Sequence, residues 1–174
     1  MDLQQYKKLI PANFSNDSRV WIYQGNRRFS NEEATGIVSL LNQFVSVWKS
    51  HGDPVKGFAD LFYDQFIVII ADESATTVGG CSTDSSVHLV KMIESKFGVS
   101  LFDRQLLAFE INEEIELLPL SQLIISVQKG LINANTLYFN NTITSKFELI
   151  NEWVQPVQNS WLSGRLNFST AVSK

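Results

Sequence analysis

The chain has 174 residues, 44% of them hydrophobic and 18% charged, which is the composition of an ordinary folded domain. Its formal net charge of -4 gives no overall positive field, so we expect no nucleic-acid partner and no attraction to a membrane. One cysteine excludes an internal disulfide, and with two histidines it makes no recognisable zinc spacing, so we expect no metal and no other cofactor. Without a signal segment or an apolar run that spans a bilayer, the protein is expected to be cytoplasmic.

The first residues predict an arm followed by a strand. Residues 1–18 mix polar and small side chains, and we interpret them as an arm that is either docked or loose. A single domain is expected over residues 19–174. Residues 19–24 alternate branched and aromatic side chains, which predicts a strand with apolar groups on both faces.

The rest of the chain predicts a mixed order of helices and strands. Ser30 and Glu33 have capping-box spacing ahead of a helical apolar pattern, so a helix is expected from there to about Ser50. The later expected elements are strands at 58–63 and 65–71, a helix at 83–97, a hairpin of strands at 105–111 and 114–118, a short helix after Pro119, a strand at 136–139 and a helix at 144–153. The order up to residue 111 matches the split βαβ pattern. We therefore expect an α+β fold with a ferredoxin-like βαββαβ core and additional C-terminal elements.

The familiar catalytic signatures are absent from the sequence. The nearest approach to a P-loop is Gly79-Gly80, which lacks the lysine that reaches the phosphates. There is also no G-x-G-x-x-G, no G-x-S-x-G, no H-E-x-x-H and no C-x-x-C. The sequence therefore excludes a P-loop ATPase and leaves open whether the protein is an enzyme.

One group of side chains, at the start of the helix expected near residue 83, is of a kind that performs catalysis. Asp84 and His88 lie one turn apart on the face opposite the apolar stripe, and Cys81 precedes them. A thiolate is favoured near a helix N-terminus, so Cys81 would be the nucleophile, His88 its base and Asp84 the group that orients the imidazole. Cys81 and His88 are seven residues apart, which on a helix is a rise on the order of 10 Å. This distance is too long for a direct hydrogen bond between the thiol and the imidazole.

The alternative for the same residues is structural. Ser82 or Thr83 would cap the helix, and Asp84 would complement its dipole. Cys81 would then be a small buried residue and His88 would lie on a solvated face. Changes at these positions would alter only the stability of the helix.

A binding site without catalysis is the third interpretation. Backbone amides at a glycine-led helix start hold a phosphate or carboxylate, which makes Gly79, Gly80, Ser82 and Thr83 candidate ligand-binding residues. Arg27 is the candidate basic group that would complete the site. We therefore predict a module that binds a small anionic ligand or a protein partner, with a thiol-dependent enzyme as the alternative. A symmetric homodimer stays open.

Four segments resemble a known family. They read VWIYQ at residues 20–24, GCSTD at 80–84, LFDR at 101–104 and FNN at 139–141. On these segments the chain resembles an uncharacterised family of short bacterial proteins often labelled "ABC transporter ATPase", over about residues 19–161. The label implies ATP hydrolysis, but the chain has neither a P-loop nor the ABC signature LSGGQ.

Overall fold

The computed structural model describes residues 2–168, which form an α+β fold. The strands are β1 (Arg19–Gln24), β2 (Lys49–Ser50), β3 (Asp53–Pro54), β4 (Lys56–Phe62), β5 (Phe66–Asp72), β6 (Leu106–Ile111), β7 (Glu114–Pro119), β8 (Leu137–Phe139) and β9 (Val154–Pro156). The α-helices are α1 (Asn31–Val47), α2 (Gly80–Phe97), α3 (Leu123–Gln128) and α4 (Lys146–Asn151). Short 3₁₀ helices are η1 (Gln5–Lys8), η2 (Leu120–Gln122), η3 (Val157–Asn159) and η4 (Trp161–Gly164).

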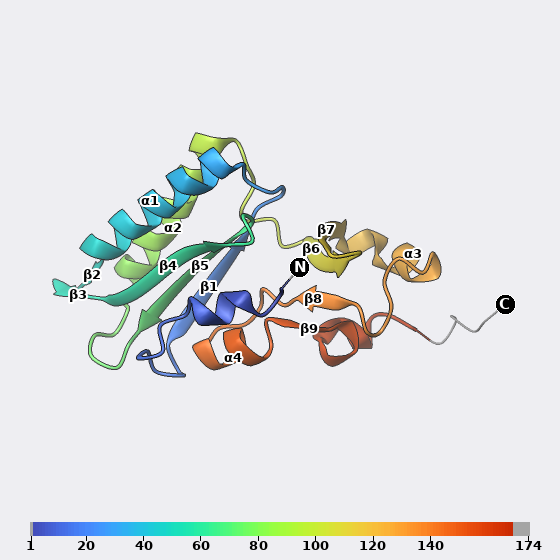
Figure 1. Ribbon diagram of the computed structural model, residues 1–174. Coiled ribbons are helices and arrows are strands. Elements are labelled where there is room, and N and C mark those ends of the chain that lie inside the picture. Colours follow the sequence, from blue (N-terminus) through green and yellow to red (C-terminus); the bar gives the residue numbers. More distant parts are fainter. Residues whose placement is uncertain (1, 169–174) are drawn as a thin grey trace.

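The strands form two larger antiparallel sheets and the small β2–β3 hairpin (Figure 1). The first sheet has the order β1-β5-β4, which is the order that a ferredoxin-like sheet has for its first three strands. The expected fourth strand, β6, lies instead in the second sheet, of order β7-β6-β8-β9. The four-stranded ferredoxin-like sheet is therefore not formed. The tight turn at Asn112 and Glu113 pairs β6 with β7, and β8 takes the other edge of β6.

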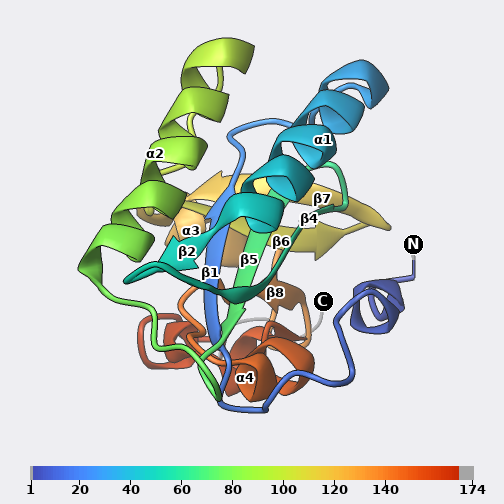
Figure 2. The ribbon, with the colours of Figure 1, turned by 90° about the vertical axis from the view of Figure 1, so that its left-hand side faces the viewer.

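Both faces of the first sheet are covered. Helices α1 and α2 run side by side across one face, while α4 and the N-terminal segment lie against the other (Figure 2). All seven residues of β5 are buried, as expected for a central strand between two layers. As predicted, β1 is apolar on both faces, with Tyr23 toward the helices and Val20 toward the opposite layer. Within residues 2–168, no helix is both long and apolar enough to cross a bilayer.

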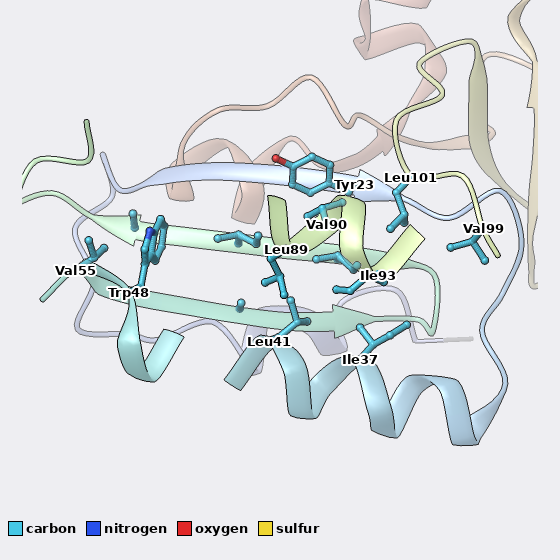
Figure 3. Packing of buried hydrophobic residues seen from close by; sticks show 14 of the residues in the cluster. Tyr23, Ile37, Leu41, Trp48, Val55, Leu89, Val90, Ile93, Val99 and Leu101 are labelled. Carbon is cyan, nitrogen blue, oxygen red and sulfur yellow. The ribbon is translucent and has the colours of Figure 1, made fainter. Parts of the chain in front are cut away.

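Apolar residues at helical spacing on α1 and α2 form the core between these helices and the first sheet (Figure 3). Ile37 and Leu41 of α1 are fully buried, and Ile93 of α2 meets them above the sheet. Helix α1 begins with the predicted capping box, in which Ser30 Oγ accepts from the backbone N–H of Glu33. These features hold both helices against the sheet. They therefore fix the positions of the C-terminal end of α1 and the N-terminal end of α2, where the candidate site lies.

The N-terminal segment is docked, which is the first of the two alternatives that its sequence left open. Its apolar side chains Tyr6 and Phe14 are buried against the sheet face opposite α1 and α2. The Lys146 ammonium, itself buried, donates to the backbone carbonyl of Phe14 at 2.6 Å. The Tyr6 hydroxyl donates to the carbonyl of Leu149 at 2.8 Å, so α4 and the segment are fastened to each other.

Candidate functional site

A short hairpin stands where the sequence predicts the last turn of α1. The helix ends at Val47, three residues before the predicted end, because β2 and β3 pair across a turn at His51 and Gly52. These two residues have φ angles of 52° and 94°, the left-handed values that a tight hairpin turn requires. The turn brings His51 to the N-terminus of α2. A Cβ atom on Gly79 would lie 2.9 Å from the His51 Nε2 atom, so only glycine lets the imidazole approach so closely.

Hydrogen bonds fasten this hairpin to the first turn of α2. The Ser82 hydroxyl donates to the carbonyl of Lys49 at 3.0 Å, and the Trp48 indole N–H donates to the carbonyl of Ser82 at 3.1 Å. The Ser50 hydroxyl donates to the carbonyl of Thr77 at 2.6 Å. These bonds fasten the hairpin to α2 and to the loop that precedes it.

A broad groove of about 830 Å³ lies between the end of α1, the β2–β3 hairpin and the first turns of α2; we call it the α2 groove. Its apolar wall consists of Phe44, Val47, Trp48, Leu89 and Met92. Its titratable side chains are Lys49, His51, Cys81, Asp84 and His88. Sequence reasoning missed Lys49 and His51, because the pattern placed them at a helix end rather than in a turn.

The three residues predicted for thiol chemistry all line the α2 groove. Cys81, Asp84 and His88 are exposed on one face of α2, which begins three residues earlier than predicted. Within residues 2–168, no hydrogen bond or ion pair joins these three side chains, and no group of three or more His, Cys, Asp or Glu is arranged to hold a metal. The structure therefore brings them to one surface without forming a triad.

The predicted ligand-binding hydroxyls are already used inside the protein. Besides the bond from Ser82 to Lys49, the Thr83 hydroxyl donates to the carbonyl of Gly79 at 3.1 Å. Gly79 is the N-cap and offers no side-chain cap. The backbone N–H groups of Gly80, Cys81 and Ser82 have no acceptor among the described residues, so the N-terminus of α2 presents donors at the edge of the groove.

Arg27 does not complete this site. Its guanidinium makes two hydrogen bonds of 2.8 Å to the Glu33 carboxylate and one of 3.0 Å to the carbonyl of Phe97. Phe97 is the last residue of α2, so Arg27 lies at the opposite end of the helix from Gly79, about 27 Å away along its axis. The predicted convergence is wrong. Arg27 and the backbone N–H of Ser30 lower the pKa of Glu33 to about 2, which fits a role at the start of α1.

The fit of Trp48 in the groove wall depends on Gly57. A Cβ atom at residue 57 would lie 2.8 Å from the Trp48 ring, whereas a Cβ at Gly80 would meet no atom within 4 Å. We expect Gly57→Ala to lower the free energy of unfolding by about 2 kcal/mol, because the indole must move from its site in the core. Gly80→Ala is expected to change it by about 0.5 kcal/mol or less. Urea unfolding of both variants checks this, and equal stabilities would contradict the packing described.

A second depression lies along the edge of β1 that faces away from β5, and we call it the β1 cleft. It consists of an inner hollow of about 100 Å³ and an outer hollow of about 180 Å³, which share five lining residues. The shared residues are Ile22, Tyr23, Arg104, Asn141 and Thr142. Sequence reasoning did not predict this cleft. The available signal was the resemblance itself, because three of its four segments, 20–24, 101–104 and 139–141, contribute to the lining.

Known proteins add no assignment to either depression. The chain was compared with protein-family models, with curated proteins and with solved structures, and none of them matches it. The family resemblance of the four segments therefore stays a prediction. A functional proposal for this chain therefore rests on the side chains and backbone amides of the α2 groove and the β1 cleft.

Proposed function

We propose that the protein is a binding module for a small anion with an apolar portion, and that the ligand occupies the α2 groove. The observation that carries this proposal is that backbone donors without an acceptor in the described part of the chain lie in the same groove as an apolar wall. Cys81 and Ser82, whose backbone N–H groups have no acceptor within residues 2–168, line the groove together with Lys49. The side chains of Phe44 and Leu89 line the same depression.

The apolar wall supports a ligand with a hydrocarbon part. Val47 is 66% exposed and Met92 is 42% exposed, although both are large apolar side chains. A hydrocarbon chain along this wall would remove both from water and gain roughly 25 cal/mol for each Å² of apolar surface that it buries. The volume of about 830 Å³ lies within the range of about 300–1,000 Å³ that is usual for small-molecule sites.

The charged end of the ligand fits the hairpin side of the groove. The positive end of the α2 dipole and its free amides favour an anion there, and Lys49 is held next to Ser82 by its backbone. Asp84 lies a turn further along the helix and repels an anion. The carboxylate or phosphate is therefore expected near Gly80, with the apolar part directed along α2 toward Met92.

Calorimetric titration with octanoate tests this proposal. We expect octanoate to bind, and octanol and inorganic phosphate to bind at least tenfold more weakly, because each lacks one half of the recognised chemistry. Lys49→Gln is expected to weaken octanoate binding about tenfold, the effect of losing roughly 1.4 kcal/mol from one charged contact. Lys91→Gln is the matched control, because Lys91 is exposed on α2 outside the groove lining. Equal affinities of the two variants, or of octanoate and octanol, would contradict the proposal.

A thiol-dependent enzyme is the second candidate, favoured by the exposed Cys81 in the same groove as two imidazoles. His51 enters from the hairpin and His88 from two turns along α2. If either imidazole activates the thiol, His51→Ala or His88→Ala will slow the alkylation of Cys81 by iodoacetamide at neutral pH. Unchanged rates in both variants would dismiss the enzyme, and octanoate binding by Cys81→Ser would favour the binding module.

A further inference from the structure

We propose that the β1 cleft is a second binding site and that it takes a small aromatic carboxylate. The proposal is independent of the α2 groove. It rests on the rings of the cleft, on its size and on a cation of its lining that makes no hydrogen bond or ion pair within residues 2–168. The inner hollow is lined by four aromatic side chains, which are Tyr23, Phe102, Tyr138 and Trp161. Phe102 is 36% exposed and Trp161 is 39% exposed, so both residues are partly open to solvent. The Arg165 guanidinium lies over the Trp161 ring, 5.2 Å from its centroid.

Most polar groups of the cleft are already satisfied. The Asn141 amide donates to the Gln24 side-chain oxygen at 2.8 Å and accepts from the Trp153 indole at 2.9 Å. The Thr142 hydroxyl donates to the side chain of Asn140 at 2.6 Å. These groups shape the cleft, but they leave little capacity to hydrogen-bond a polar ligand.

Arg104 is the exception. It lines both hollows, is exposed, and makes no hydrogen bond or ion pair within residues 2–168. The other charged residue of the lining, Asp103, accepts a hydrogen bond of 2.8 Å from the backbone N–H of Gln105. Burial raises the pKa of the Tyr23 phenol, and Arg104 partly opposes this rise, so the guanidinium lies within electrostatic reach of the inner hollow. A planar guanidinium in this place matches a carboxylate through two parallel hydrogen bonds.

The volume of the cleft suits a ligand with a single six-membered ring. A closed apolar cavity of about 150 Å³ holds benzene, so the inner hollow of about 100 Å³ accepts most of one six-membered ring and the outer hollow takes the remainder. Both volumes lie below the range of drug-sized sites. Edge-to-face contacts of the kind that Tyr23 and Phe102 already make, with ring centroids 5.3 Å apart, would extend to the ligand.

Benzoate is the probe for this site, and its binding to the full chain is measured by two-dimensional ¹H–¹⁵N NMR. We expect a dissociation constant on the order of 1 mM, with saturable shifts at Tyr23 and Phe102. Benzyl alcohol and cyclohexanecarboxylate are expected to bind at least fivefold more weakly, because the first lacks the charge and the second the flat ring. Arg104→Gln should weaken benzoate binding about tenfold, and Arg28→Gln, which removes an exposed arginine outside the cleft, should leave it unchanged.

The outcomes separate this site from the α2 groove. Lys49→Gln is expected to leave benzoate binding unchanged, whereas shifts confined to Gly80 and Cys81 would place benzoate in the groove and overturn the proposal. Equal binding of benzoate by Arg104→Gln and by the unmodified chain would overturn it as well. Because Arg104 is exposed, the variant is expected to keep the melting temperature of the unmodified chain, which a thermal scan checks.

Discussion

Replacing Trp153 by alanine is expected to lower the free energy of unfolding by about 4 kcal/mol. Trp153 is fully buried and joins the two halves of the chain. Its ring lies 4.7 Å from that of Tyr6 in the N-terminal segment, 5.3 Å from Phe66 in β5 and 5.5 Å from Phe139 in β8. Alanine would leave a cavity among aromatic rings that cannot collapse without moving both sheets.

Chemical denaturation, followed by circular dichroism, measures this effect. Trp153→Phe is the matched control, because it keeps most of the ring contacts and loses the hydrogen bond from the indole N–H to Asn141. We expect it to lower stability by about 1.5 kcal/mol, including the effect of the unsatisfied amide oxygen. If Trp153→Ala lowers the free energy of unfolding by less than about 1 kcal/mol, this side chain does not have the proposed role in joining the two sheets.

Replacing Lys56 by methionine is expected to destabilise the fold by about 2 kcal/mol at neutral pH. The Lys56 ammonium lies 2.6 Å from the carboxylate of Asp72, whose side chain is 1% exposed. Methionine keeps the length of the side chain but removes the cation, and it leaves this carboxylate with hydrogen bonds from the backbone N–H groups of Ser15 and Ser74 and from the Ser74 side chain. A buried charge that loses its counter-ion is strongly unfavourable.

The pH dependence identifies the cause. Lys56 and the hydrogen bonds to Ser74 hold the pKa of Asp72 well below its usual range. The ionised carboxylate therefore stabilises the native state above the ordinary pKa of aspartate, and this contribution is lost as the pH falls through the lower native value. The difference between Lys56→Met and the unmodified chain should shrink below about pH 4. A difference that is constant from pH 7 to pH 3, in urea titrations against Lys91→Met as control, would rule out this ion pair as the cause.

Local signals in the sequence predict most individual elements. Ser30 and Glu33 form the predicted capping box, and Gly98 ends α2 with a φ of 61°. Asn112 and Glu113 have φ angles of 53° and 66° in the predicted hairpin turn. Each of these features depends on residues that are neighbours in the chain, so their pattern is visible without knowledge of the tertiary structure.

Choices that depend on distant partners were not predictable in the same way. The apolar pattern of β6 suits a strand in either sheet, and only its pairing with β7 and β8 decides the matter. The β2–β3 hairpin has two residues in each strand, too few for a periodic signal, so the sequence pattern extends the helix to about Ser50 and does not predict the turn that carries His51. Arg27 has a suitable charge, but its bonds to Glu33 and Phe97 place it at the far end of α2.

The candidate site was predicted in composition better than in geometry. Cys81, Asp84 and His88 do share a surface, because residues three, four and seven apart on a helix lie on one face. The expected hydroxyl ligands Ser82 and Thr83 instead bond to carbonyls, a competition that sequence spacing does not resolve.

A ¹H–¹⁵N NMR titration with octanoate tests the central claim, that the α2 groove binds an apolar anion, most directly. The account predicts that the amide resonances of Gly80, Cys81 and Ser82 shift together and saturably, since these donors have no acceptor within residues 2–168. The same resonances should stay in place with octanol. Unchanged amides at the start of α2, at octanoate concentrations that saturate binding elsewhere on the protein, would contradict it.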